Sequence, residues 1–122
     1  MNKLGYKELL QIKGNGRVIY IIGKYRADNE ENKRANILHA QRVACRLWEL
    51  GWIVLTPHLN TAHFELYTDL PNEVFLKGGL ELMRKCANAV FVLDNWGDSD
   101  GSRIEFELAR ELGLDIYYED SK

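Results

Sequence analysis

Three short segments of the chain are apolar at almost every position. They are Val18–Ile22, Trp52–Leu55 and Ala89–Leu93, and β-branched and aromatic residues dominate them. Runs of this length and composition predict strands that are covered on both faces, as in a parallel sheet. A fourth segment, Asp115–Tyr118, predicts a last strand before a charged tail.

Between these strands, apolar residues recur at helical spacing and predict helices over residues 34–50, 71–85 and 103–112. Paired glycines, Gly78 and Gly79, interrupt the second helix and indicate that something packs closely there. Strands that alternate with helices predict right-handed crossovers and helices on both faces of the sheet. The expected fold is therefore α/β: a three-layer sandwich with an open, mainly parallel sheet of four to five strands, flavodoxin-like or Rossmann-like.

Length and composition predict a single domain over residues 1–122, in which residues 1–16 form an N-terminal extension. Sixteen Lys and Arg against 18 Asp and Glu give a net charge of -2, which argues against binding to polymeric nucleic acid. No apolar run is long enough to cross a membrane, and no signal-peptide core is present, so we expect a cytoplasmic protein without a membrane partner. Cys45 and Cys86 are expected to be reduced core thiols.

Polar loops follow the predicted strands at their carboxyl ends, where open parallel sheets bind ligands. Gly23 lets the backbone approach a ligand, and the Arg26 guanidinium suits a phosphate or carboxylate, although a solvated strand end is the simpler interpretation of this segment alone. His58 and His63 lack the spacing and the carboxylate partner of a metal site, so we expect neither a metal ion nor a cofactor. Trp96 is either a stacking wall for a base or a rim aromatic.

The segment 96–105 runs from a strand end into a helix start. Backbone N–H groups there, beside Gly101 and Ser102, make a cradle for an anion or phosphate. Ser102 and Glu105 also have the spacing of a capping box. Spacing alone favours this helix cap over an anion site. The helix is expected to bury an apolar stripe formed by Ile104, Leu108 and Leu112. This stripe turns Glu105 toward the sheet, and an inward carboxylate is costly unless it is used or paired, so Glu105 is the best candidate for a reactive group.

At these residues the chain resembles the nucleoside 2-deoxyribosyltransferase superfamily, in particular small deoxyribosyltransferase-like proteins of phages and bacteria. The resemblance runs from about Val18 to Tyr118. It rests on segments 20–27, 56–61 and 95–109. The last segment is the most specific, because the family places a Ser or Asp, a Gly and a nucleophilic Glu at the spacing of Ser99, Gly101 and Glu105.

The resemblance implies that Glu105 attacks the anomeric carbon of a nucleoside sugar, expels the base and leaves a glycosyl-enzyme intermediate for a nucleobase or water. Ser99 and Arg26 match the nucleotide N-glycosidase branch, and both suit a 5′-phosphate. Many relatives carry an active-site Asp where this chain has Asn88, and an amide cannot protonate a leaving base. Catalysis is then weak, rerouted through Asp94 or Asp98, or lost, which leaves a catalytically silent nucleotide-binding protein as the alternative.

The site implied by the resemblance has Glu105, Tyr20 and Asn88 as catalytic residues. Its substrate-binding residues are Gly23, Tyr25, Arg26, His58, Asn60, Asp94, Trp96, Ser99, Gly101 and Ser102. The implied partners are a small nucleoside or nucleotide and further copies of the chain, in a homodimer or larger homo-oligomer. Trp48 and Phe106 have no place in the predicted core, which favours an aromatic interface between the copies.

Overall fold

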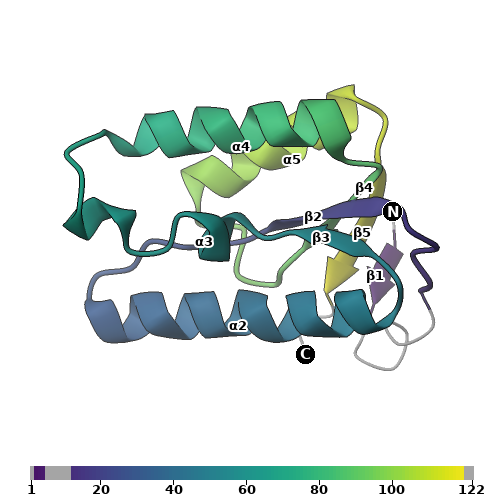
Figure 1. The fold of residues 1–122 in the computed structure, drawn as a ribbon, viewed down its shortest axis with the longest axis horizontal. Helices are drawn as coiled ribbons and strands as arrows, with labels where there is room; N and C mark the ends of the chain where they lie inside the picture. Colours follow the sequence, from purple (N-terminus) through teal and green to yellow (C-terminus); the bar gives the residue numbers. More distant parts are fainter. Residues whose placement is uncertain (1, 5–11, 120–122) are drawn as a thin grey trace.

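The chain forms a parallel sheet between two layers of helices (Figure 1). The computed structural model describes residues 2–4 and 12–119. In chain order the elements are β1 (Asn2–Leu4), β2 (Val18–Ile22), α2 (Glu30–Glu49), β3 (Ile53–Leu55), α3 (Pro57–Asn60), the 3₁₀ helix η1 (Phe64–Leu66), α4 (Asn72–Cys86), β4 (Ala89–Val92), α5 (Asp100–Glu111) and β5 (Asp115–Glu119). The predicted α/β three-layer sandwich is confirmed.

The strand order β1-β5-β4-β2-β3 puts β2 and β4 at the centre and leaves β3 at an edge. All the described pairings are parallel, and Ile22 pairs with Val92, so the carboxyl ends of β2 and β4 lie level. β3, the strand that follows β2 in the chain, lies on one side of β2, and β4 lies on its other side. The crevice between the β2 and β4 loops is therefore the switch point at which such sheets bind ligands.

Alternate residues of β2 face the two helical layers. Ile19 and Ile21 pack into the core beneath α2, whereas Tyr20 and Ile22 pack into the core beneath α4 and α5. This alternation points Tyr20 toward α4 and α5, which begin at the carboxyl edge of the sheet. Of the helices in the described ranges, none combines the length and apolar character that crossing a membrane requires.

Two of the helices begin earlier than the apolar spacing predicted. α2 begins at Glu30 rather than Arg34, and α5 begins at Asp100 rather than Arg103. The side chains of Asn29 and Ser99 cap these helices by accepting hydrogen bonds from backbone N–H groups three residues later. Such capping turns are polar, so an apolar pattern does not detect them.

The N-terminal extension also holds an element that no pattern predicted. Residues Asn2–Leu4 form β1, which pairs in parallel with β5.

The apolar stripe predicted for α5 is wrong at two positions. Ile104 and Leu112 are 48% and 38% exposed, whereas Phe106 is buried. The Phe106 ring packs 4.8 Å from that of Trp96 and 6.0 Å from that of Tyr118, in an aromatic cluster that forms only when the β4 loop and β5 meet α5. Phe106 thus has a place inside one chain. The homo-oligomer stays a prediction that rests on exposed Trp48 and on the family resemblance.

The prediction of core thiols is also wrong. Cys45 and Cys86 are free and exposed. α2 turns Ala44 and Leu47 toward the sheet, and α4 turns Met83, so each cysteine lies on the outer side of its helix.

Candidate active site

A pocket of about 520 Å³ opens at the carboxyl edge of β2 and β4. Its walls come from the loop after β2, from α3 and from the first turns of α4 and α5. We call it the Glu105 pocket. The predicted site residues that line it are Tyr20, Gly23, Tyr25, Arg26, His58, Ser99, Gly101, Ser102 and Glu105. The structure therefore brings most of the predicted site together from three separate loops.

A buried pair, Tyr20 and Glu105, lies in this wall. The Tyr20 hydroxyl donates a hydrogen bond of 2.5 Å to Oε2 of Glu105, and the two side chains are 0% and 8% exposed. Burial raises the pKa of Glu105 to about 7, against the opposing effect of the Tyr20 hydrogen bond. Burial and the adjacent carboxylate raise the pKa of Tyr20 far above its ordinary value, so Tyr20 stays a donor. Near neutral pH, Glu105 exchanges readily between acid and carboxylate.

The start of α5 provides polar groups of a different kind. The Ser99 hydroxyl accepts a hydrogen bond of 3.2 Å from the Ser102 N–H and so caps the helix. The capping box between Ser102 and Glu105 is wrong, because the helix starts three residues earlier and Glu105 binds Tyr20. Ser102 is 1% exposed, and its hydroxyl oxygen has no hydrogen-bond partner. Together with the first N–H groups of α5, which have no intrahelical acceptor, this hydroxyl makes a site suited to an anion.

Arg26 supplies a cation at the same pocket. Its guanidinium donates to the Asn72 side-chain oxygen from both terminal nitrogens at 2.6 Å, with the Asn72 amide oriented to suit that contact. Within the described ranges no carboxylate pairs with Arg26. Lys24, by contrast, forms an ion pair of 3.3 Å with Asp98. Arg26 is therefore the basic group of this pocket that is available to a ligand anion.

His58 is buried in the pocket wall, and its ring nitrogens lack hydrogen-bond partners. It is 3% exposed, and neither ring nitrogen has a hydrogen-bond partner of acceptable geometry. Burial lowers its pKa to about 4, although the backbone of Gly23 and Lys24 opposes the shift. The ring is neutral at physiological pH, with one donor and one acceptor nitrogen. Buried polar atoms without partners are rare in folded proteins, and here they line a ligand-sized cavity.

Four of the predicted site residues lie elsewhere. Asn88 precedes β4 at the amino edge of the sheet, where its Oδ1 accepts a hydrogen bond of 2.8 Å from the Val18 N–H. Asp94 lies beside His39, with 4.0 Å between its Oδ1 and the His39 Nε2. Trp96 packs against Phe106, and Asn60 lines a neighbouring cavity. The position matched to an active-site Asp thus stabilises a strand end in this chain.

Sequence reasoning missed the contribution of α4. Asn72, Phe75 and Leu76 of this helix line the Glu105 pocket. One signal was present: α4 follows β3, and a helix after a parallel strand begins near the carboxyl edge of the sheet. The paired glycines were a second signal, because a Cβ atom on Gly79 would lie 2.6 Å from the Tyr20 hydroxyl oxygen. The predicted close approach at these glycines is confirmed at Gly79.

Opposite pKa shifts predict opposite responses of Glu105 and His58 to acid. The raised pKa of Glu105, about 7 against an ordinary 4.5, adds stability as the pH falls from 7 to 4.5. The lowered pKa of His58, about 4 against 6.5, removes stability as the pH falls from 6.5 to 4. Relative to wild type, Glu105→Gln should lose roughly 3 kcal/mol of unfolding free energy between pH 7.5 and 4.5, and His58→Gln should gain a similar amount. Urea unfolding at both pH values measures this.

Glu111→Gln, at an exposed position of the same helix, is the control for the loss of one negative charge. If the difference between Glu105→Gln and wild type does not vary with pH, Glu105 titrates normally and the buried-acid description is wrong.

Comparison with known families identifies a matching family model. A family model described as a domain of unknown function, DUF4406, matches residues 17–118. This range contains every element that lines the Glu105 pocket. No curated protein matches the chain.

Proposed function

This chain belongs to the DUF4406 family, and we propose that it cleaves or transfers the N-glycosidic bond of a nucleoside or its 5′-monophosphate, with Glu105 as the nucleophile. The observation that carries the proposal is the buried Glu105 carboxyl group, held by Tyr20 in the wall of a ligand-sized pocket and with its pKa raised to about 7. Carboxylates positioned in this way act as nucleophiles or acids in glycosidic chemistry. The resemblance to nucleoside 2-deoxyribosyltransferases supports the same role.

The proposed reaction has two displacements at one carbon. A Glu105 carboxylate oxygen attacks the anomeric carbon, the bond from that carbon to the base nitrogen breaks, and its electron pair leaves with the base. Water or a second base then attacks the same carbon and releases Glu105. The Tyr20 hydrogen bond orients the carboxylate and favours its ionised form. Of the two aspartates considered as proton donors to the base, Asp94 lies outside the pocket, and Asp98 lines it but is held in an ion pair with Lys24. Neither is assigned that role.

The test of the proposed activity is chromatographic. Incubation of deoxynucleosides and their monophosphates with the wild-type protein should release free base. Ligand binding without any base release would instead support the catalytically silent nucleotide-binding protein.

Arg26 and the polar groups at the start of α5 favour the monophosphate over the nucleoside as the ligand of the Glu105 pocket. We expect Arg26→Ala to lower affinity for a nucleoside 5′-monophosphate about tenfold, the scale of one charge-assisted contact, and to leave nucleoside affinity unchanged. Calorimetric titration of both ligands measures the two affinities. Arg17→Ala is a matched control, because Arg17 pairs with Asp115 and lines neither this pocket nor its neighbour. Equal affinity of the wild type for nucleoside and monophosphate would remove the phosphate assignment.

A further inference from the structure

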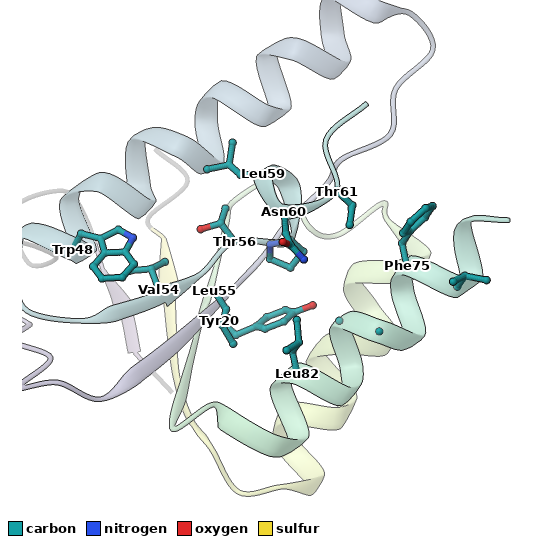
Figure 2. A pocket seen from close by; sticks show the side chains of 14 residues that line it. Tyr20, Trp48, Val54, Leu55, Thr56, Leu59, Asn60, Thr61, Phe75 and Leu82 are labelled. Atoms are coloured by element: carbon teal, nitrogen blue, oxygen red, sulfur yellow. The ribbon is translucent and has the colours of Figure 1, made fainter. Parts of the chain in front are cut away.

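A second cavity, of about 680 Å³, adjoins the Glu105 pocket. We call it the Gly78 groove, and it lies between β3, α3 and α4. The two cavities share Tyr20, Pro57, Thr61 and Phe75 in their walls. Figure 2 shows Asn60 and Thr61 on one side of the groove, and Phe75 and Leu82 of α4 on the other. The Tyr20–Glu105 pair therefore lies where two ligand-sized cavities meet.

The groove has a different chemical character from the Glu105 pocket. Most of the side chains that line it are apolar: Trp48, Val54, Leu55, Pro57, Leu59, Val74, Phe75 and Leu82. Its polar side chains carry no formal charge, and they are Tyr20, Thr56, Asn60 and Thr61. Arg26, the charged group available to an anion, lines the Glu105 pocket instead. Apolar walls with a few placed polar groups are typical of binding sites for small organic ligands.

Gly78 and Gly79 leave the groove wall without side chains next to the Tyr20–Glu105 pair. A Cβ atom on Gly78 would meet nothing within 4 Å, so this position faces open space. A Cβ atom on Gly79 would lie 3.9 Å from Oε2 of Glu105. Glycine inside a helix costs about 1 kcal/mol relative to alanine, and no steric contact explains that cost at Gly78. Its effect is to keep the wall of the groove free of a side chain.

We infer that the Gly78 groove binds the nucleobase of the substrate while the Glu105 pocket binds the sugar and its phosphate; this inference rests on the proposed function. In the displacement, the nucleophile and the leaving base lie on opposite faces of the anomeric carbon, so the base belongs in a cavity whose wall Glu105 does not form. Arg26, Ser99 and Ser102 assign the anionic end to the Glu105 pocket. The remaining cavity suits a planar base, stacked near Phe75 with its polar edge toward the Asn60 amide, which has both donors and an acceptor.

The experiment adds a side chain to the wall of the groove at Gly78 and leaves Tyr20 and Glu105 unchanged. Gly78→Leu should lower affinity for a purine nucleoside 5′-monophosphate at least tenfold and leave affinity for ribose 5-phosphate, which has no base, unchanged. Gly78→Ala should give a smaller loss of the same kind. Exposed Glu81→Leu adds the same side chain to α4 outside both cavities and should change neither affinity. Urea unfolding of each variant confirms that it folds.

Each outcome bears on one proposal. Unchanged purine monophosphate affinity in Gly78→Leu, or an equal loss for both probes, would overturn the base assignment even if the wild type releases base. Selective loss of the purine ligand in a protein that releases no base would support the assignment and overturn the proposed activity. A wild type that binds ribose 5-phosphate and the purine monophosphate equally well would overturn the assignment too, because the base would then contribute nothing.

Discussion

Glu105→Gln is expected to lower the rate of base release by roughly 10³-fold or more, the scale on which removal of a nucleophile acts in enzymes. Glutamine keeps the shape of the side chain and can still accept the Tyr20 hydrogen bond, but its amide does not form a stable ester with a sugar. Ligand affinity should change little. Base release per active site, measured by chromatography at saturating nucleotide, tests the expectation.

The pH dependence of the same reaction provides a second measurement. Because the carboxylate is the attacking form and the pKa of Glu105 is about 7, the rate of the first displacement should rise as the pH increases through 7. The hydrogen bond from Tyr20 lowers the pKa of Glu105, so Tyr20→Phe should move the midpoint to higher pH. Full activity in Glu105→Ala, or a pH midpoint that Tyr20→Phe does not move, would contradict the assigned roles.

Gly79→Ala is expected to destabilise the protein by roughly 1–3 kcal/mol, the usual effect of forcing a methyl group into a packed site. The new Cβ atom would lie 2.6 Å from the Tyr20 hydroxyl oxygen. Tyr20 is fully buried and hydrogen-bonded to Glu105, so its ring cannot swing aside as an exposed side chain would. Either α4 shifts or the Tyr20–Glu105 bond breaks, and base release should fall together with stability.

Gly78→Ala is the matched control on the adjacent residue. The same substitution there meets open space, so the gain in helix propensity should appear as stabilisation of up to about 1 kcal/mol. Urea unfolding of the two variants measures the contrast. Equal stability changes at the two positions would show that α4 does not press on Tyr20, and the close approach assigned to Gly79 would be wrong.

Much of the architecture could be predicted from local patterns. The bounds of β2 are those of its apolar run, and an inward Glu105 followed from helical spacing alone. The same spacing misjudged Phe106, because its partners Trp96 and Tyr118 belong to other elements. Asn88 shows the limit of a matched motif: its sequence position agrees with an active-site acid, yet the strand register puts its side chain against Val18 at the opposite edge of the sheet.

The sequence by itself determined the parallel α/β sandwich, the polar loops at its carboxyl edge and the inward position of Glu105, because these depend on the two-residue and 3.6-residue periods of neighbouring positions. Only the tertiary structure decided what Glu105 meets there. Tyr20 is 85 residues away in the chain, yet its hydroxyl lies 2.5 Å from the Glu105 carboxylate. The pKa of Glu105 and the two cavities that meet beside it arise from side chains of several elements. Desolvation and enclosed volume depend on everything that surrounds a group, so no local pattern contains them.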